Sequence, residues 1–469
     1  MIEIDRLVLN NSQNCFVPYL FFSSDSIIIE KMDFQNSLTP YLPEEEIQGL
    51  LKAIQEGKTT HCLLINTDKI TDEEFVKRFP NVRKHPFVEH AYYYDKEEYD
   101  FGSSLYYLAG VYSIQDASAM MVNYFLKPEE DDVILDMCAA PGGKSIGASI
   151  AMNGKGCIIS NDISYPRAKE MSQNVERMGR GNIVVSSTDF VFSYVHFGDT
   201  FDKIILDAPC SGSAMMRKNE AAEQDWKYSK VKANAKRQSE LLELAYNMLK
   251  PGGIISYSTC SFSYEEDEAV ILAFKEKHKE IEIVPLPEDP SFYRTSALPE
   301  AVRLHPNHFE GEGQFICLLK KPGTITKTKK TIISNERYKL FCQDYGIQER
   351  SNELRRDKFY SLYQHFDVSH LNILRYGVKL FEMRDSGIFI PDHHLAAYLD
   401  VSYSVKITEE EAKAYIYGNT FPMDKEDGFY IVSYDNVNLG FVKVTQGIAK
   451  NHYPKSCIVM AKQRKIFGD

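Results

Sequence analysis

One segment limits the possible folds of this chain more than any other: an apolar run at residues 133–138 that leads into the turn Pro141-Gly142-Gly143. A helix-compatible segment, residues 145–152, follows directly. Glycine tolerates a tight turn and lets the backbone approach a ligand, and the first amides of a helix are unpaired donors. The segment therefore predicts a strand, a glycine-rich turn and a helix that form a nucleotide-binding cradle. A purely structural turn is the alternative.

The loop matches neither of the two commonest nucleotide-binding motifs. It is not G-x-G-x-x-G, and the chain has no G-x-x-x-x-G-K-[ST] phosphate loop. NAD and ATP are therefore not the first ligands to expect.

The apolar run is the first of seven that are bounded by turn signals between about residues 96 and 321. Amphipathic helical stretches, such as 164–178 and 231–249, lie between most of them. This alternation predicts a doubly wound α/β sheet whose ligand binds at the carboxyl ends of the strands. The pattern allows an antiparallel hairpin for the last two strands but does not require it. The seven runs are 133–138, 157–162, 183–187, 203–208, 253–258, 281–285 and 314–319.

Carboxylates close the second and third predicted strands. Asp162 lies twenty residues after Gly142, the distance at which dinucleotide-binding folds place an acid that accepts hydrogen bonds from ribose hydroxyls. Asp189 follows the third strand, where it can reach an adenine amino group. A role as a helix N-cap or turn residue is the alternative for Asp189.

Two further strand ends each carry a thiol. The fourth run leads to Asp207 and Cys210, and the fifth leads to Cys260. A lone buried cysteine is usually inert packing. Two thiols at neighbouring strand ends beside a cofactor loop indicate nucleophilic chemistry instead, because thiolates attack electron-poor carbons.

Three ordered motifs stand out in this region: Cys138-Ala139-Ala140-Pro141-Gly142-Gly143-Lys144, Asp207-Ala208-Pro209-Cys210-Ser211-Gly212 and Tyr257-Ser258-Thr259-Cys260. Together they resemble the RNA 5-methylcytosine methyltransferases of the Nol1/Nop2/Sun (Fmu) family. Residues 303–306 with 311–315 resemble the closing segment of that family, and residues 115–120 resemble the helix before its first strand. The tail at 450–455 is similar to that of the bacterial RsmF (YebU) branch, whose extra domains include a PUA-like RNA-binding unit.

The resemblance implies S-adenosylmethionine as the cofactor. In the family scheme, the Cys260 thiolate attacks carbon 6 of cytosine, and Cys210 assists loss of the carbon 5 proton and release of Cys260. Asp207 and Lys144 stabilise charge on the ring. The target base must be single-stranded or flipped out, because a stacked base cannot present carbon 6. The implied cofactor contacts are Cys138, Ala139, Ala140, Pro141, Gly142, Gly143 and Lys144 around the methionine part, Asp162 on the ribose, Asp189 near the adenine, and Asp207 between cofactor and base.

We expect more than one domain, since 469 residues exceed a single hydrophobic core. The predicted fold class is α/β: a Rossmann-like class I methyltransferase domain with a seven-stranded sheet, an N-terminal mixed α/β segment and C-terminal β-rich, PUA-like domains. The predicted parts are an N-terminal RNA-binding or scaffold segment (1–95), the methyltransferase domain (96–321), a basic linker (322–334), a small intermediate domain (335–390) and a PUA-like RNA-binding domain (391–469).

The net charge of −12 has the wrong sign for a protein that coats nucleic acid by bulk attraction. RNA contact would need local basic patches, for which 217–237 and 450–465 are the candidates. No run approaches eighteen apolar residues, and the N-terminus does not resemble a signal peptide, so we expect no membrane contact. Nine cysteines without framework spacing or metal-ligand clusters fit a reducing cytoplasm and predict no metal site. We expect a monomer.

The expected substrate is cytosine in 16S ribosomal RNA, within a small subunit or its assembly intermediate. Large-subunit (23S) RNA and transfer RNA are the alternative substrates. A DNA cytosine methyltransferase would use the thiol of the Pro209-Cys210 motif as its nucleophile, so the second thiol at Cys260 favours the RNA family. A non-catalytic ribosome-assembly factor is the alternative from another class, and a small-molecule methyltransferase would hardly need the C-terminal β-rich domain.

Overall fold

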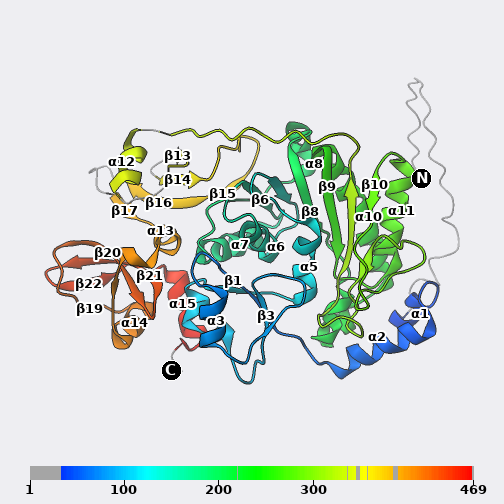
Figure 1. The fold of residues 1–469 in the computed structure, drawn as a ribbon, viewed down its shortest axis with the longest axis horizontal. Helices are drawn as coiled ribbons and strands as arrows, with labels where there is room; N and C mark the ends of the chain where they lie inside the picture. The colour runs from blue at the N-terminus through cyan, green and yellow to red at the C-terminus, as the bar shows by residue number, and fades with distance from the viewer. Residues whose placement is uncertain are drawn as a thin grey trace, which may run out of the picture.

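A central nine-stranded sheet with helices on both faces organises the molecule (Figure 1). The computed structural model describes residues 33–218, 220–334, 336–344, 349–355, 358–383 and 389–466. The strand order is β10-β12-β9-β8-β5-β6-β7-β15, and β11 pairs with β12. The strands are β5 (Val133–Asp136), β6 (Cys157–Asn161), β7 (Ile183–Ser186), β8 (Phe201–Asp207), β9 (Leu249–Thr259), β10 (Glu282–Val284), β11 (Val302–Arg303), β12 (Phe315–Lys320) and β15 (Ile373–Tyr376).

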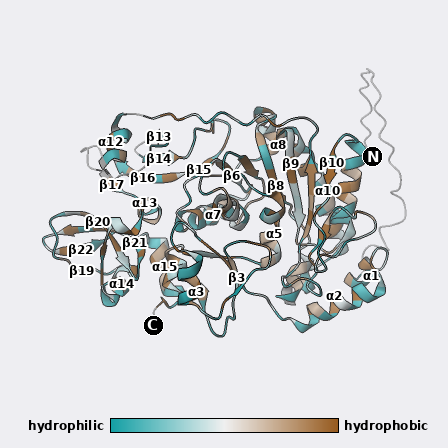
Figure 2. Ribbon diagram, in the orientation of Figure 1, coloured by the Kyte–Doolittle hydropathy of each residue, from teal (hydrophilic) through white to brown (hydrophobic). Residues whose placement is uncertain are grey.

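The central strands are buried on both faces. Val133 and Leu135 of β5 belong to a core with α10 (Tyr228–Met248) and α11 (Glu268–Lys277). Ile134, between them, faces the opposite core, which includes α5 (Ala117–Leu126), α6 (Gly143–Ala151) and α7 (Tyr165–Arg177). Because neither face meets water, the strands are continuous apolar runs. Figure 2 shows this hydrophobic colouring in the sheet.

All seven predicted runs form strands of this sheet, so the doubly wound fold is confirmed. Strands β5 to β9 are parallel, which brings their carboxyl ends to one edge. Strand β12 runs antiparallel to both β9 and β10, so the last two predicted strands do form an antiparallel pair.

The predicted number of strands was wrong, because β11 and β15 add to the seven. Strand β15 comes from the predicted intermediate domain and pairs antiparallel with β7, so β15 forms the edge of the sheet. Its partner lies far away in the sequence, so no local pattern could reveal the pairing. The predicted domain boundaries stay predictions.

The N-terminal segment forms a four-stranded antiparallel sheet in the order β2-β3-β1-β4. The elements are α1 (Phe34–Leu38), α2 (Glu44–Glu56), β1 (Cys62–Ile65), α3 (Asp72–Arg78), β2 (Arg83–Lys84), β3 (Ala91–Tyr93), α4 (Leu105–Leu108) and β4 (Tyr112–Ile114).

The C-terminal part is β-rich, as predicted, with sheets in the orders β13-β14-β16-β17 and β18-β20-β21-β22-β19. Its elements are α12 (Glu336–Asp344), β13 (Ser351–Arg355), β14 (Lys358–Leu362), β16 (Val378–Met383), β17 (Phe389–Pro391), α13 (His393–Tyr398), β18 (Ser404–Lys406), α14 (Glu409–Ile416), β19 (Phe421–Pro422), β20 (Gly428–Tyr434), β21 (Val437–Thr445), β22 (Ile448–Asn451) and α15 (Lys455–Gln463).

The two ends of the described chain share one hydrophobic core. Leu63 and Ile65 of β1 belong to the same buried cluster as Tyr415 of α14 and Val442 of β21. In Figure 1 helix α15, in red, lies beside α3, in blue. The hydrophobic core beside the N-terminal sheet is therefore completed by residues from the C-terminal part of the chain.

The basic linker is held against the central sheet. Lys327 forms an ion pair with the buried carboxylate of Asp132, and the Lys250 ammonium donates to Thr328 Oγ1 at 2.7 Å. The linker is thus a strap with fixed contacts. Across the described ranges, no helix has the length and apolar character needed to cross a membrane.

Candidate active site

The loop between β5 and α6 is fixed by contacts from β6 and α7. The Ala139 amide donates to the Asn161 carbonyl at 2.7 Å, and the Arg167 guanidinium donates to the Ala140 carbonyl at 2.9 Å. Gly142 has φ +106°, and a Cβ there would lie 3.1 Å from Cγ of Met171. Only glycine fits this position without strain, as expected for a tight cofactor turn.

A cavity of about 640 Å³ opens at the carboxyl ends of β5, β6 and β7, and α10 forms its opposite wall. We call it the strand-end cavity. Three of the predicted cofactor residues line it: Cys138, Asp162 and Asp189. They come from three separate strand ends, so the fold brings them together as the sequence predicted.

The buried carboxylate of Asp162 keeps one oxygen free of hydrogen bonds. Oδ1 accepts from the Ser164 amide at 2.9 Å, whereas Oδ2 accepts no hydrogen bond from the described residues. The Arg167 guanidinium lies 3.3 Å from Oδ2 as an ion pair, and its side chain is largely exposed. A buried acceptor without a donor suits the hydroxyl of a ligand.

Asp189 combines a place at the cavity with a capping role. It lines the strand-end cavity. It is also the N-cap of α8 (Phe190–Ser193), because its Oδ1 accepts from the Val191 amide at 3.0 Å. The alternative that the sequence left open is therefore confirmed, and a ligand contact is compatible with it.

The remaining predicted cofactor residues lie beside the strand-end cavity rather than on its wall. None of Ala139, Ala140, Pro141, Gly142, Gly143, Lys144 and Asp207 is among the described residues that line it. Residues 139–143 are absent from the wall because the loop is turned towards α7, whose side chains donate hydrogen bonds to the carbonyls of Ala140 and Pro141.

Asp207 is the centre of a polar network. Its Oδ2 accepts from the Lys144 ammonium at 2.6 Å, and its Oδ1 accepts from Ser258 Oγ at 2.8 Å and from the Gln314 amide at 2.9 Å. Burial acts to lower the pKa of Lys144, but the adjacent Asp207 carboxylate outweighs it and the pKa is raised. Lys144 is therefore a firmly charged cation at the strand ends.

The two predicted thiols are in contact. The Sγ atoms of Cys210 and Cys260 lie 3.2 Å apart, although fifty residues separate them in the chain. The hydrogen bond with Cys260, and then burial, raise the pKa of Cys210 well above the usual value. Cys210 therefore holds its proton more tightly than an ordinary thiol does.

The sequence did not single out four residues that complete this site. Asp136, at the end of β5, is fully buried, and burial raises the pKa of its carboxyl to about 7. Asn161 accepts a hydrogen bond from the cofactor loop, and Gln314 donates one to Asp207. Glu266 accepts hydrogen bonds next to both cysteines. The sequence does offer a signal for Asp136, because it is a carboxylate at the end of an apolar strand. It offers none for Glu266, which lies outside the strands.

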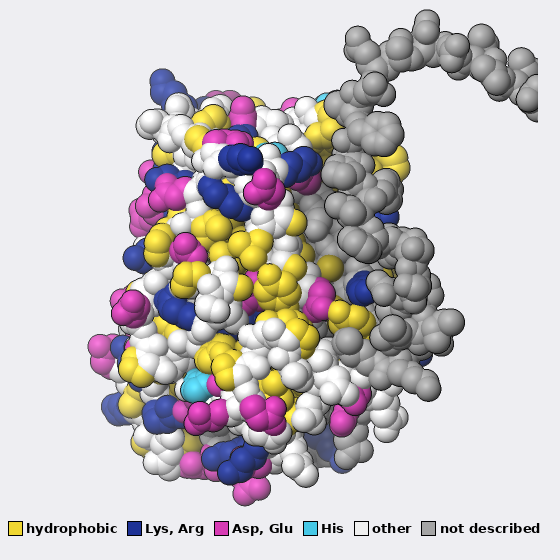
Figure 3. Space-filling model, turned by 90° about the vertical axis from the view of Figure 1, so that its right-hand side faces the viewer, with side chains coloured by type: hydrophobic (Ala, Val, Ile, Leu, Met, Phe, Trp, Pro, Cys, Tyr) yellow, Lys and Arg dark blue, Asp and Glu magenta, His cyan; other side chains and the backbone are white. Residues whose placement is uncertain are grey.

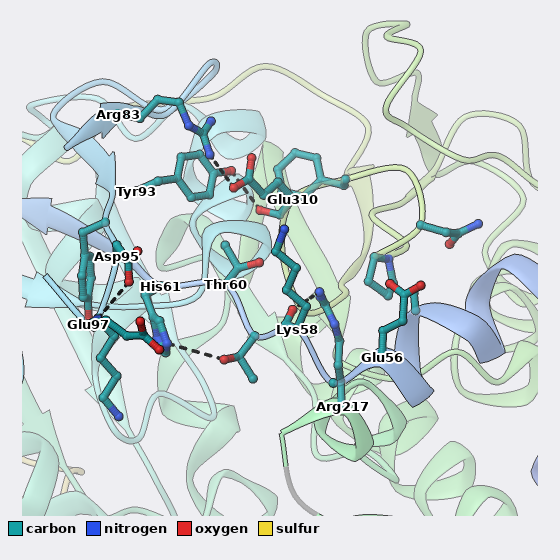
Figure 4. A pocket seen from close by; sticks show the side chains of 18 of the residues that line it. Glu56, Lys58, Thr60, His61, Arg83, Tyr93, Asp95, Glu97, Arg217 and Glu310 are labelled. Atoms are coloured by element: carbon teal, nitrogen blue, oxygen red, sulfur yellow. Dashed lines mark hydrogen bonds and ion pairs between the residues drawn. The ribbon is translucent and has the colours of Figure 1, made fainter. Parts of the chain in front are cut away.

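A second, larger cavity of about 1150 Å³ lies between the N-terminal segment and residues 306–310 (Figure 4). Its arginines are already engaged, since Arg83 pairs with Glu310 and Arg217 lies 3.7 Å from Glu312. The face shown in Figure 3 likewise intersperses Lys and Arg with Asp and Glu. Neither feature offers a single large cationic surface.

Family models match most of the chain from residue 31 onward. A model described as 16S rRNA methyltransferase RsmB/F matches residues 123–320. The N-terminal domain of 16S rRNA methyltransferase RsmF matches residues 31–117, and the methyltransferase RsmF PUA domain matches residues 402–458.

Curated relatives match over nearly their whole length. Ribosomal RNA small subunit methyltransferase F of Shewanella piezotolerans is 27% identical over 91% of this chain and 97% of its own. The protein of the same name from Vibrio campbellii is 28% identical over 89% and 98%.

Solved structures share the central fold. A methyltransferase homolog protein from Pyrococcus horikoshii aligns with a TM-score of 0.53 and 29% identity, covering 61% of this chain and 93% of its own. NSun6 from Pyrococcus horikoshii with SFG aligns with a TM-score of 0.55 and 20% identity over 62% and 98%, which concerns the fold alone. With these matches the resemblance first drawn from three motifs is confirmed: the chain belongs to the RsmB/F methyltransferase family and carries the N-terminal and PUA domains of its RsmF branch.

Proposed function

We propose that this protein methylates carbon 5 of a cytosine in RNA, and that its substrate is 16S ribosomal RNA in a small subunit or an assembly intermediate. The contact between Cys210 and Cys260 carries the proposal, because a single thiol would suffice for addition to the ring. Family membership and the names of the curated relatives support ribosomal RNA as the substrate.

The residues of the strand-end cavity fit S-adenosylmethionine. Asp162 would accept hydrogen bonds from the ribose hydroxyls through its free Oδ2, and Asp189 would lie near the adenine. Cys138 and the adjoining loop through Lys144 would surround the methionine part. When bound, this cofactor supplies a methyl group on a positively charged sulfur, which an electron-rich carbon can accept.

The first chemical task of the chain is to make carbon 5 of cytosine electron-rich. In the proposed step the Cys260 thiolate forms a bond to carbon 6, and the electron pair of the 5,6 double bond moves towards carbon 5. Lys144, which is held by Asp207, stabilises the negative charge that develops on the ring. Asp207 itself is kept in place by Ser258 and Gln314.

The second task is to release the product. Because the Cys210 sulfur lies 3.2 Å from the Cys260 sulfur, Cys210 can give its proton to Cys260 as the bond to carbon 6 breaks. The Cys210 thiolate formed in this way accepts the proton from carbon 5, and the electron pair of that C–H bond restores the ring double bond. Cys210 has then regained its proton, and Cys260 is left as a thiol. Cys260 loses that proton to solvent before the next attack, so the reaction as a whole releases one proton.

We infer that the N-terminal half of α10 contacts RNA phosphates. Lys232, Lys236 and Arg237 are exposed there, and none of them pairs with an acid within the described part of the chain. Lys236 and Arg237 also line the mouth of the strand-end cavity. In a protein of net charge −12, unpaired cations beside the site are the local attraction that RNA binding needs.

The proposal is tested by methyl transfer from labelled S-adenosylmethionine to small subunits from a strain that lacks the gene. Bisulfite sequencing of the product should reveal one or more new 5-methylcytosines in 16S RNA. Transfer only to 23S RNA or transfer RNA would assign a different substrate to the same chemistry. Cys260→Ala should reduce transfer by at least about 10³-fold, as expected for loss of a covalent nucleophile. Full activity in that variant would remove Cys260 from the mechanism.

A further inference from the structure

A buried carboxylate links the two loops that carry the cysteines. Glu266 is the last residue of the short 3-10 helix Tyr264–Glu266, and its side chain is fully buried. It accepts hydrogen bonds from the amide of Ser211 at 2.8 Å and from the hydroxyl of Ser211 at 2.5 Å. The hydroxyl of Ser261 donates to the same carboxylate at 2.5 Å. Glu266 thus joins two loops that come from neighbouring strands.

The residues that Glu266 holds are the direct neighbours of the two thiols. Ser211 follows Cys210, and Ser261 follows Cys260. The two hydroxyls also lie 3.2 Å from each other, the same separation as the two sulfurs. A shift of either serine would therefore move the adjacent sulfur.

A third contact strengthens the arrangement. The Gln238 amide of α10 donates to Glu266 at 3.2 Å and to the Pro209 carbonyl at 2.9 Å. The carboxylate therefore has donors from both cysteine loops and from α10. Burial raises the pKa of Glu266, which shows the cost of placing a carboxylate there. Such a cost is usual where a buried polar group has a specific task.

We propose that Glu266 is a positioning residue that sets the distance between Cys210 and Cys260 and so permits proton transfer between them. The inference rests on the proposed function and adds a residue that touches neither sulfur. The negative charge of Glu266 also disfavours a thiolate at Cys210 in the resting site, which keeps on Cys210 the proton that it must later deliver.

The loops have other connections, so removing the carboxylate should loosen the thiols without opening the site. The Ala214 amide donates to the Cys260 carbonyl at 3.0 Å, and the Phe262 amide donates to Ser213 Oγ at 2.8 Å. Glu266→Gln keeps the size of the side chain but removes the charge and one acceptor oxygen. Glu265→Gln is the matched control, because the neighbouring Glu265 accepts from Tyr41 and Tyr228 instead.

The first measurement reports the position of the two sulfurs without RNA or cofactor. Phenylarsine oxide condenses with two adjacent thiols and releases water, so its affinity depends on the distance between them. Wild type and Glu265→Gln should bind it equally, Glu266→Gln at least tenfold more weakly, and Cys210→Ala should show no two-thiol binding. Wild-type affinity in a folded Glu266→Gln variant would overturn the proposal.

The second measurement separates positioning from a general loss of structure. Glu266→Gln should lower kcat by about tenfold or more, leave KM for RNA within twofold, and accumulate a denaturant-resistant protein–RNA adduct, because release needs Cys210 beside Cys260. A variant that was merely unfolded would form less adduct, and that result would contradict the proposal. Should Glu266→Gln fail to fold, Ser261→Ala provides the test. It removes the hydroxyl that donates to Glu266, contacts Ser211 and accepts from the Ser263 amide, but it keeps the carboxylate. This variant should show the same changes to a smaller degree, whereas wild-type behaviour would refute the proposal.

The two hypotheses fail in different ways. If wild-type protein transfers no methyl group to RNA cytosine but the arsenical affinities differ as expected, the proposed function is wrong and the positioning role stands. If wild type methylates RNA and the Glu266→Gln variant matches it in both measurements, only the positioning role is wrong.

Discussion

In the proposed mechanism, the proton on Cys210 decides whether the covalent product can leave. Cys210→Ala removes the group that lies 3.2 Å from the Cys260 sulfur, while Cys260 stays able to attack. We expect this variant to accumulate a protein–RNA adduct that survives denaturing electrophoresis, because addition continues and elimination slows.

The controls for this prediction come from the same pair of thiols. Cys260→Ala and the double variant should form no adduct, since the attacking sulfur is absent. Normal turnover of Cys210→Ala with no adduct would exclude Cys210 from product release.

Asp136 should make stability depend on pH near neutrality. Its carboxyl is buried and its pKa is raised to about 7, so the folded protein holds this proton more tightly than the unfolded chain does. The stabilisation is complete below about pH 4 and is lost as the pH rises through about 7, with a slope of at most about 1.4 kcal/mol per pH unit.

Denaturant unfolding of wild type and Asp136→Asn between pH 5 and 8 measures this effect. The variant carries no titrating group at the position, so the stability of wild type relative to the variant should fall over that range. Parallel curves for the two proteins would show that the carboxyl is already ionised at pH 5.

The sequence predicted that the two proposed catalytic thiols lie together, whereas it did not reveal the residues that hold them. Cys210 and Cys260 follow strand ends in recognisable motifs, and neighbouring parallel strands carry their ends to the same edge of a sheet. Glu266 and Gln314 act through hydrogen bonds across the fold. A sequence shows their identity but not the partner that each meets.

At the scale of elements, the RNA contact proposed for α10 would lie beside the strand-end cavity, which Lys236 and Arg237 of this helix line. Replacing Lys232 and Lys236 by alanine removes two exposed cations from one face of this helix. We expect weaker RNA binding, and the slope of log affinity against log salt should become shallower by about 1.5, as two phosphate contacts require.

The matched control removes two lysines that already pair with acids, Lys277 with Glu243 and Lys279 with Glu276. Lys277 is the last residue of α11, and Lys279 follows it in the connection to β10. Their double alanine variant should keep the wild-type salt slope. Equal slopes for the α10 variant and wild type would place the RNA elsewhere.

The elements of the central sheet were predictable because both of its faces are buried. Continuous apolar runs between turn signals identified seven of its nine strands: β5, β6, β7, β8, β9, β10 and β12. The sequence did not predict strand β15, because it is a single strand at the edge of the sheet. It includes Arg375, which forms hydrogen bonds with Ser172 and His394. A polar edge strand lacks the apolar run that identifies its neighbours.

At the scale of the whole molecule, the contact between the two ends of the chain should be measurable from a single side chain. The Arg464 guanidinium donates to the Gly102 carbonyl and lies 4.5 Å from the ring centre of Tyr107. Arg464→Ala should speed amide exchange in residues 101–108 by roughly tenfold, since it removes a charged hydrogen bond and a cation–π contact of about 1–2 kcal/mol together.

Lys462→Ala is the control, because it removes a cation from the same helix at an exposed position. It should leave exchange in residues 101–108 unchanged. Equal exchange in all three proteins would mean that α15 does not stabilise the N-terminal segment.

The core shared by the two ends has a consequence for synthesis on the ribosome. Strand β4 ends at Ile114, but α14, which packs into the same core, begins only at Glu409. At typical elongation rates the intervening stretch of roughly 300 residues takes about 15–60 s to translate. Throughout that time the N-terminal sheet keeps an apolar face uncovered. We therefore expect the N-terminal sheet to finish folding only after the C-terminal part of the chain has been made, and its apolar face to be open to chaperones until then.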